Sequence, residues 1–417
     1  MARSASPRLH YAWVVFVVGF ITLVGAAGFR STPSILIDPL NEEFGWTRAT
    51  VGLAVSINVV LYGLAGPFAA ALQLRYGLRR VTMVSLMVIA LGAFGTTRMT
   101  HPWQLFCLWG VVVGIGSGCM ATVFASTVAS RWFVRHRGFV TGALTAASAS
   151  GQLVFLPLLT RLAGTHGWRV VGLVIGASAL AVVPLVFAFL RNSPEDVGLT
   201  PLGAPDDFAP IVSTVNPVKH ALDTLRASRR DTVFWLLWGS FFVCGLSTNG
   251  LIGTHFLSAA NDHAIHAATA AEYLALIGVF DVVGTIASGW LTDRVDPARL
   301  LVAYYLFRGL SLLILDPAMG APGLGLLGFM VFYGLDWVAT VPPTVALCTR
   351  RFGTAAGPVV FGWVFAGHQI GAAVAAWGAG FLRDSTGSYL PAFIVAGFGC
   401  VVAAYGASLM TIDRAKV

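Results

Sequence analysis

Three charged residues lie inside segments that are otherwise apolar and long enough to cross a bilayer. They are Asp281 in IGVFDVVGTIASG, Arg308 in LVAYYLFRGLSLLIL and Asp336 in FMVFYGLDWVAT. A charge at the centre of a bilayer costs roughly 2.5–3.5 kcal/mol on insertion scales, so such residues pair with one another or serve a function. Burial favours the protonated form of a carboxyl group and a nearby arginine favours the ionised form, so a carboxylate whose pairing alternates can exchange protons. We therefore expect Asp281 to be the first candidate for proton coupling and Asp336 the second.

Arg308 has two interpretations on the sequence alone. It either forms a structural ion pair with Asp281 or Asp336, or it contacts a substrate directly. Asp336 in turn either exchanges protons or only neutralises Arg308. His368, in WVFAGHQIGAA, is a further candidate for proton exchange because the unperturbed pKa of an imidazole, near ~6.5, lies close to physiological pH. A neutral, hydrogen-bonded histidine in the core is the alternative.

Arg30, in AAGFRSTPS, lies late in the first apolar segment. An arginine stays charged and can bind a carboxylate through two parallel hydrogen bonds, so Arg30 is a candidate anchor for an anionic substrate. The alternative is a side chain that snorkels to the membrane surface. Four polar residues in apolar segments are candidate substrate contacts, with interhelical hydrogen bonding as the alternative: Asn58, Gln152, Asn249 and His255.

Motifs for enzyme chemistry are missing from the sequence. It contains no metal-ligand spacing, no phosphate-binding loop and no nucleophile motif. The closely spaced glycines of GVVVGIGSG (Gly110–Gly118) lie inside an apolar segment with no strand before them, so they indicate close helix packing. We therefore expect no catalytic residue, no metal and no cofactor, and a protein that is not an enzyme.

The composition indicates what positions these residues. Of the 417 residues, 57% are hydrophobic and only 11% are charged, which is typical of a multi-pass membrane protein. The formal net charge of +8 does not indicate a nucleic-acid partner, because the Lys and Arg residues fall in short runs between apolar segments. The expected surroundings of the chain are therefore a lipid bilayer.

Twelve apolar segments of spanning length can be found, in two groups of six. They lie near 11–34, 48–72, 79–98, 104–130, 137–161 and 167–190, and near 232–257, 268–292, 298–316, 321–348, 356–381 and 387–411. The longest polar stretch separates the groups. The sequence therefore predicts an N-terminal six-helix bundle (1–191), a cytoplasmic linker loop (192–231) and a C-terminal six-helix bundle (232–417).

Most of the 26 Lys and Arg residues fall in the loops on one side of the twelve predicted segments. Basic residues concentrate in the cytoplasmic loops of membrane proteins, so both termini and the central loop are expected in the cytoplasm. We expect a multi-pass protein of the cell inner (cytoplasmic) membrane that is monomeric.

Two loop sequences recur in both groups. AALQLRYGLRR (Ala70–Arg80) corresponds to GWLTDRVDPAR (Gly289–Arg299), and RWFVRHRGFVTG (Arg131–Gly142) corresponds to RRFGTAAGPVVFG (Arg350–Gly362). Such repeats indicate two related bundles with a substrate path between them.

At these loops the chain resembles the major facilitator superfamily, whose loop after the second helix approximates G-x-x-x-D-R-x-G-R-R. The resemblance implies a fold of twelve transmembrane helices in two pseudo-symmetric six-helix bundles. It also implies that the loop Asp latches the halves together at a helix N-terminus in the outward-facing state, with a loop that only fixes topology as the alternative. The first copy has Ala70 and Leu74 in place of the Gly and the Asp, so its latch is in doubt. The residues that match the pattern are Arg75, Gly77, Arg79 and Arg80 in the first copy, and Gly289, Asp293 and Arg294 in the second.

Within the superfamily the chain is similar to the monocarboxylate and oxalate/formate transporters. The matching stretches are AWVV (Ala12–Val15), EEFGWTR (Glu42–Arg48), RWFVRHRGFVTG, FDVVGTIASG and RDSTGSY (Arg383–Tyr389). The group often has an Arg one turn after the Asp of its eighth helix, and here that position is Thr285. Arg30 resembles the cation that the group has in its first helix. The ninth helix is peripheral in this superfamily, which favours the ion-pair interpretation of Arg308.

The residues and the resemblance together imply a secondary active transporter that works by alternating access. We expect it to move a small organic anion, a monocarboxylate, together with protons. The alternative is an exporter or carrier of a neutral or aromatic compound, drug-like or vitamin-like, on the same fold. The many aromatic residues and Thr285 favour that alternative.

Overall fold

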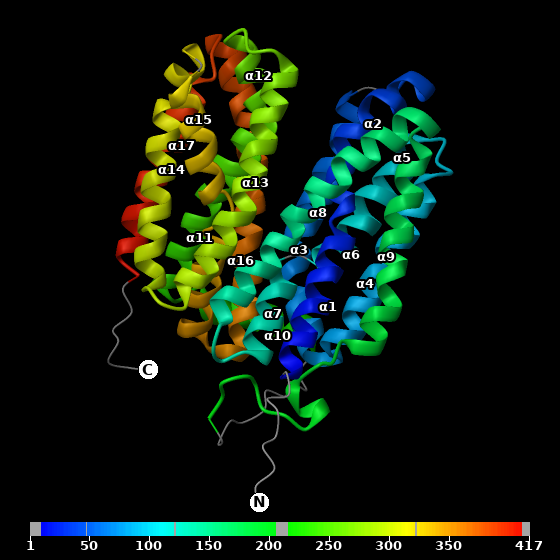
Figure 1. The fold of residues 1–417 in the computed structure, drawn as a ribbon, viewed down its shortest axis with the longest axis vertical. Helices are drawn as coiled ribbons and strands as arrows, with labels where there is room; N and C mark the ends of the chain where they lie inside the picture. The colour runs from blue at the N-terminus through cyan, green and yellow to red at the C-terminus, as the bar shows by residue number, and fades with distance from the viewer. Residues whose placement is uncertain (1–9, 47, 121, 206–215, 322, 411–417) are drawn as a thin grey trace, which may run out of the picture.

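The chain folds into two bundles of long helices that lie side by side (Figure 1). The computed structural model describes residues 10–46, 48–120, 122–205, 216–321 and 323–410, and within these ranges it contains helices but no β-strand. Long apolar segments form helices because a helix satisfies its backbone hydrogen bonds within the segment, where lipid offers none. The all-α fold expected from the sequence is confirmed.

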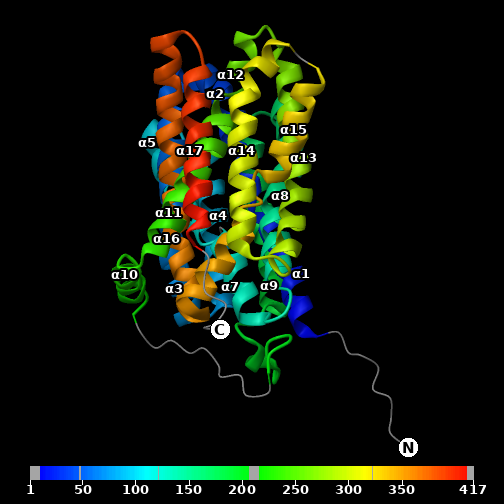
Figure 2. The same cartoon turned by 90° about the vertical axis from the view of Figure 1, so that its left-hand side faces the viewer.

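The first bundle contains α1 (Tyr11–Ala26), α2 (Gly28–Phe44), α3 (Arg48–Tyr76), α4 (Leu78–Thr96), α5 (Pro102–Leu105), the π-helical η1 (Phe106–Val113), α6 (Gly114–Gly118), α7 (Thr122–Trp132), α8 (Arg137–His166) and α9 (Arg169–Phe189). The 3₁₀-helix η2 (Pro194–Val197) and α10 (Pro217–Ser228) follow. The second bundle contains α11 (Thr232–Gly245), the π-helical η3 (Leu246–Ile252), α12 (Gly253–Asp262), α13 (Ala267–Thr292), α14 (Pro297–Gly320), α15 (Leu324–Asp336), α16 (Val341–Thr386) and α17 (Leu390–Ser408). The helices run roughly parallel to the long axis of the molecule (Figure 2).

Nine helical stretches in the described part of the chain are long and apolar enough to cross a membrane. One of them, Leu324–Arg383, has 60 residues and contains a turn at Gly353. The φ angle of Gly353 is 82°, which is incompatible with a right-handed helix. A helix of that length would be about 90 Å long, three times the thickness of the hydrocarbon core, so this stretch crosses twice. Apolar α1 is shorter, and α8, with 30 residues, covers a further predicted segment.

The two bundles contact each other closely near one end of the molecule. We call the end at which α1 begins and α17 ends the terminal end, and the opposite end the distal end. The contacts are made by α8 with α13 and by α3 with α16, and the bundles diverge toward the distal end (Figure 1). A Cβ atom added to Gly142 would lie 2.6 Å from the carbonyl oxygen of Thr285. Glycine therefore allows the two backbones to touch at this contact.

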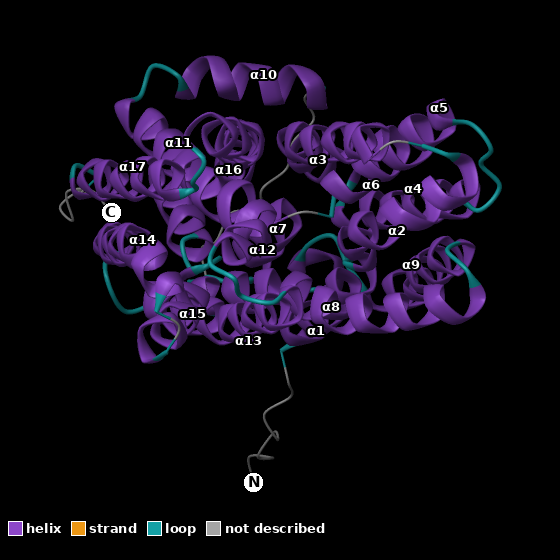
Figure 3. Ribbon diagram, turned by 90° about the horizontal axis from the view of Figure 1, so that it is seen from above, coloured by secondary structure: helices purple, strands orange, loops and turns teal. Residues whose placement is uncertain are grey.

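The short helix α10 lies at the edge of the molecule beside α16 and α3, and it runs across the direction of the longer helices (Figure 3). The Asn216 side chain caps it by accepting hydrogen bonds from the backbone N–H groups of Val218 and Lys219. Its buried face packs against both α3 and α16, and Trp363 Nε1 donates to the carbonyl oxygen of Ala221 at 3.1 Å. The segment between the bundles thus contacts both of them.

Candidate functional site

The helix that contains Asp336 is interrupted in the middle of its span. α15 ends at Asp336, a turn covers residues 337–340, and α16 begins at Val341. Pro342 and Pro343 occupy the first turn of α16, where a helix needs no N–H donor. Because prolines disrupt a continuous helix, the Val-Pro-Pro sequence accounts for the interruption just past Asp336. An interrupted helix leaves backbone groups without intrahelical partners, and side chains from other helices must bind them.

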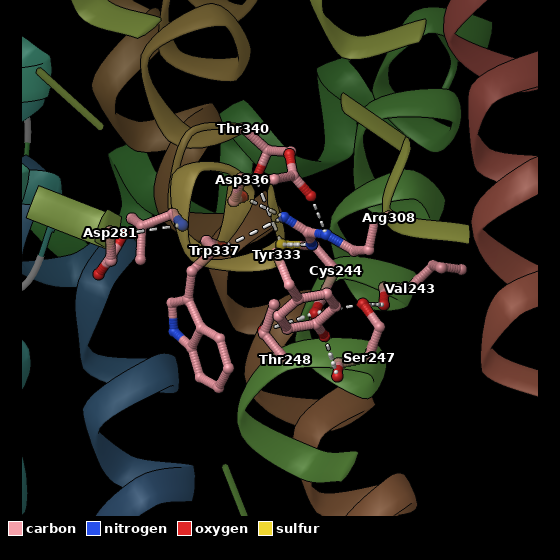
Figure 4. Close-up of polar contacts among 11 residues, drawn as sticks. Val243, Cys244, Ser247, Thr248, Asp281, Arg308, Tyr333, Asp336, Trp337 and Thr340 are labelled. Atoms are coloured by element: carbon pink, nitrogen blue, oxygen red, sulfur yellow. Dashed lines mark hydrogen bonds and ion pairs between the residues drawn. The ribbon is translucent and has the colours of Figure 1, made fainter. Parts of the chain in front are cut away.

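Arg308, on α14, binds one side of this turn. Its Nε donates to Asp336 Oδ2 at 2.6 Å, and its Nη2 donates to the backbone carbonyl oxygens of Asp336 (2.6 Å) and Trp337 (3.2 Å) (Figure 4). The side chain of Arg308 is 0% exposed. The guanidinium thus neutralises the acid and also satisfies carbonyl groups at the end of α15, where a cation is favourable. Of the two acids considered as partners, the structure pairs Arg308 with Asp336; direct contact with a substrate stays a prediction.

Cys244, at the end of α11, completes the surroundings of this guanidinium. Arg308 Nη1 donates to Cys244 Sγ at 2.9 Å, and the sulfur also lies 3.3 Å from Thr340 Oγ1. The ring of Tyr305 lies 5.7 Å from the guanidinium carbon. The role of Cys244 could not be predicted from the sequence, because a lone cysteine in an apolar segment carries no signal of a polar neighbour.

Asp281, on α13, binds the other side of the turn. Its Oδ1 accepts hydrogen bonds from Thr285 Oγ1 at 2.9 Å and from the backbone N–H of Val338 at 3.1 Å. One turn further along α13, Ser288 Oγ donates to the carbonyl oxygen of Ala339 at 2.5 Å. Thr285, which replaces the arginine of the similar transporters, therefore has a structural partner here: it orients the carboxyl group of Asp281.

The two acids predicted for proton coupling thus lie on either side of one four-residue turn. Both are buried, with 4% of Asp281 and 5% of Asp336 exposed. Protonation of Asp336 would weaken its pairing with Arg308, and protonation of Asp281 would weaken its hydrogen bond with Val338. The protonation state of either acid can therefore change how firmly the turn is held.

Two aromatic residues beside Asp336 link the turn to the π-helix η3. Tyr333 Oη donates to the carbonyl oxygen of Ser247 at 2.7 Å, and the rings of Tyr333 and Trp337 pack edge to face at 5.6 Å. Trp337 is partly exposed, whereas Tyr333 is 1% exposed. Neither residue was among the predicted site residues, although both lie within one turn of Asp336 and that spacing could have identified them.

The equivalent helix of the first bundle also contains a turn. α6 ends at Gly118, and the turn covers Cys119 and Met120. Gln73 Nε2 donates to the carbonyl oxygen of Cys119 at this turn, at 3.2 Å. Both copies of the helix therefore contain a turn, but the charged residues occur only in the second copy.

His368 lies on α16 and packs among aromatic rings. Its imidazole stacks on Phe365 at 5.7 Å and lies 5.1 Å from the ring of Phe241, with 7% of the residue exposed. The neighbouring Gln369 contacts α3, because a Cβ atom added to Gly63 would lie 2.6 Å from its Cγ. Proton exchange by His368 stays a prediction.

Asn58 and His255 both make interhelical hydrogen bonds. Asn58 Nδ2 donates to the carbonyl oxygen of Trp109 at 2.8 Å. His255 contacts the carbonyl oxygen of Ala376 at 2.8 Å through Nε2, and Tyr389 Oη at 3.2 Å through Nδ1. Interhelical hydrogen bonding was the alternative to substrate contact at these positions. Contact with a substrate stays a prediction for both residues.

Three further predicted substrate contacts remain. Asn249 lies in η3, is partly exposed, and accepts a hydrogen bond from Thr254 Oγ1 on its carbonyl oxygen at 2.9 Å. Arg30 lies in α2 and Gln152 in α8, but the side chains of both fall outside the part of the chain that the structure describes. Their roles stay predictions.

The loop carboxylate of Asp293 binds across the two bundles. Its Oδ1 accepts from the backbone N–H of Gly138 at 2.8 Å, and its Oδ2 accepts from that of Phe139 at 3.0 Å. These are N–H groups in the first turn of α8, where a negative charge is favourable. This is the geometry that a latch requires, and close packing of Gly289 against Gly138 supports it.

The other residues of the predicted latch lie apart from this contact. Arg294 lies in the turn just after α13 and packs back on that helix, with its guanidinium 3.9 Å above the ring of Trp290. In the first copy Leu74 is buried, and Gly77 adopts a φ of 88° before α4 begins. The arginines of that copy, Arg75, Arg79 and Arg80, line a pocket at the terminal end.

Comparisons with known proteins agree with this architecture. The family model described as Major Facilitator Superfamily matches residues 16–376. The chain is 24% identical to the uncharacterized MFS-type transporter YcxA of Bacillus subtilis (strain 168), over 92% of this chain and 91% of that protein. It is 27% identical to monocarboxylate transporter 13 of Bos taurus, over 95% of this chain and 88% of that protein.

Solved structures show the same fold. A double-tryptophan mutant of XylE superposes with a TM-score of 0.77 at 14% identity, covering 98% of this chain and 97% of that one. FucP in the outward conformation superposes with a TM-score of 0.68 at 18% identity, covering 97% of this chain and 100% of that one. The major facilitator fold expected from the sequence is confirmed.

Proposed function

The chain belongs to the major facilitator superfamily, and we propose that it is a secondary active transporter that moves a small monocarboxylate together with protons. The observation that carries the proposal is the turn between α15 and α16, which is held by two buried acids and one buried arginine. A substrate path between the two bundles would pass this interrupted helix.

The substrate class is supported by the similarity to monocarboxylate transporters and by Arg30. Arg308 is enclosed and already paired with Asp336, so we assign the substrate carboxylate to Arg30, on α2 of the other bundle. Arg30 would bind the carboxylate through two parallel hydrogen bonds.

Proton coupling is supported by the positions of Asp281 and Asp336 around the turn. When Asp281 is protonated, its hydrogen bond with the backbone of Val338 weakens. The turn can then move, and with it the contact between α13 and α15. We therefore assign the coupled proton to Asp281, and we assign to Asp336 the neutralisation of Arg308.

Alternating access would proceed by rocking one bundle against the other. We place the protein in the cell inner membrane with both termini cytoplasmic, and we divide it into bundles 1–191 and 232–417 joined by 192–231. The terminal end is then cytoplasmic, and the contacts there correspond to an outward-facing state. The carboxylate of Asp293 holds that state by binding the N-terminus of α8.

Uptake by purified protein in proteoliposomes tests the proposal. We expect labelled lactate, pyruvate or a related monocarboxylate to accumulate when the outside is acidic, and not when the pH gradient is collapsed. Arg30→Ala should abolish uptake, whereas Arg299→Ala, a matched change at an exposed arginine, should leave it intact. Uptake that ignores the pH gradient would refute proton coupling, and full activity of Arg30→Ala would refute the assigned anchor.

A second candidate function is transport of a neutral or aromatic compound. It is favoured by the enclosure of Arg308 and by the partly exposed indole of Trp337, which stands beside the turn where an aromatic substrate would stack. Under this alternative, an uncharged aromatic compound would be transported by the wild type and by Arg30→Ala at the same rate. Trp337→Ala would then abolish the activity.

A further inference from the structure

A basic pocket of about 570 Å³ lies at the terminal end of the first bundle. It is formed by the last turn of α3, Gly77, the start of α4, the ends of α7 and α9, and the residues that follow α9. Four arginines line it: Arg75, Arg79, Arg80 and Arg131. Neither α15, α16 nor Asp293 contributes to this pocket, so it is separate from the transport site proposed above.

Arg131 is the buried member of the four, with 9% of the residue exposed. Its Nη1 donates to the carbonyl oxygen of Asn192 at 3.2 Å, but its Nε has no hydrogen-bond partner among the residues that the structure describes. The Nε of Arg79 is likewise buried without a described partner, and its guanidinium lies 4.4 Å above the ring of Phe187. Buried donors are almost always satisfied, so these two N–H groups indicate an acceptor supplied from outside the protein.

The backbone around the pocket also favours a negative charge. α4 begins directly after Gly77, which has no side chain to cap the helix. Asn192 Oδ1 accepts from the backbone N–H of Arg79 at 3.0 Å. A helix N-terminus beside arginines is a suitable site for an anion.

No acid among the described residues lines the pocket. Leu74 occupies the position at which the second copy of the loop has Asp293, so the loop itself supplies no carboxylate. Glu195 and Asp196, in η2, act on Arg131 electrostatically. Asp196 accepts a hydrogen bond from the backbone N–H of Asn192 at 2.9 Å, and neither acid lines the pocket. The described lining of the pocket is therefore basic, and it favours an anion.

We propose that this pocket binds the phosphate group of an anion, which is supplied either by a membrane lipid headgroup or by a free phosphate compound. Guanidinium groups bind phosphate oxygens through pairs of parallel hydrogen bonds, so the free N–H groups of Arg79 and Arg131 suit this ligand. Tyr76 and Phe187, which also line the pocket, are 52% and 61% exposed. These rings give the pocket an apolar rim along which lipid chains can lie.

Thermal unfolding of the purified full-length protein in an uncharged detergent tests this proposal. Unfolding is followed by the fluorescence of the 12 tryptophans at constant ionic strength. The probes are short-chain phosphatidylglycerol, short-chain phosphatidylcholine, and inorganic phosphate matched against chloride. We expect at least one phosphate probe to raise the unfolding temperature of the wild type by several degrees. This shift should disappear in the Arg79→Gln/Arg131→Gln double variant and persist in Arg299→Gln, a change at an exposed arginine of the second loop copy.

The pattern of responses identifies the source of the phosphate. A shift with phosphatidylglycerol but not with inorganic phosphate assigns the site to a lipid headgroup, and a shift with inorganic phosphate assigns it to a free compound. The proposal is overturned if no probe produces a shift, if the double variant keeps it, or if Arg299→Gln loses it equally. Should the double variant fail to fold, Arg75→Gln/Arg80→Gln, at exposed side chains, replaces it with the same expected loss. Transport is not measured, so this outcome is independent of the proposed function.

Discussion

Removal of Arg308 should destabilise the protein more than removal of both members of its ion pair. In Arg308→Met, the carboxylate of Asp336 keeps its burial but loses its cation, and breaking a buried pair in this way costs about 3–5 kcal/mol. In Arg308→Met/Asp336→Leu both charges are gone, and replacement of a buried pair by apolar residues is often nearly neutral.

The double variant should still lose some free energy of unfolding, because it lacks two hydrogen bonds to the backbone. Arg308 also donates to the backbone carbonyl oxygens of Asp336 and Trp337, which remain after both substitutions. Each of these two hydrogen bonds contributes about 1 kcal/mol, so the free energy of unfolding of the double variant should be about 2 kcal/mol lower than that of the wild type. Asp336→Leu alone leaves an unpaired guanidinium and should lose about 3–5 kcal/mol.

Reversible unfolding in mixed micelles, with increasing dodecyl sulfate, measures these free energies. The sum of the two single losses should exceed the loss of the double variant by more than about 3 kcal/mol, which is the coupling between the two residues. Arg294→Met is the matched control, because that guanidinium is exposed and packs on its own helix, and it should change the free energy by less than about 0.5 kcal/mol. Additive losses, or a loss below about 1 kcal/mol for Arg308→Met, would refute the reasoning.

Three further outcomes are expected. Asp281→Asn should retain substrate exchange across proteoliposomes but lose accumulation driven by a pH gradient; loss of both would show that Asp281 is needed for more than coupling. Asp293→Asn should weaken the contact with the N-terminus of α8 and shift the conformational equilibrium toward opening of the terminal end by roughly 1–2 kcal/mol. Distances between spin labels on the two bundles measure this shift, and unchanged distance distributions would contradict it. Arg169 hydrogen-bonds to Glu43 and lowers the pKa of that carboxyl below its ordinary 4.5, so the stabilisation is complete above pH 4.5 and is lost as the pH falls through the lower folded pKa. The unfolding temperature should fall less at acidic pH in Arg169→Gln than in the wild type. If the unfolding temperatures of the two proteins depend on pH in the same way, this contribution of Glu43 is excluded.

Part of the candidate site follows from the sequence and part does not. Asp281, Arg308 and Asp336 are identified by the cost of a charge in lipid, and Pro342 and Pro343 predict the interruption after Asp336. The choice of Asp336 as the partner of Arg308 does not follow, because both acids were compatible with the sequence. Cys244 gave no signal either, since its contact with Arg308 joins residues 64 positions apart.

The sequence by itself determined the all-helical membrane architecture, because length and hydropathy decide which segments can cross a bilayer and the bilayer leaves helices as their only conformation. The resemblance of its repeated loop to the major facilitator pattern also predicted a latch role for Asp293. Only the tertiary structure decided that Asp293 binds the N-terminus of α8, and that Asp281 and Arg308 hold opposite sides of one turn. The physical reason is that hydrogen bonds of a few ångströms depend on how helices pack and rotate against one another, and hydropathy carries no information about those rotations.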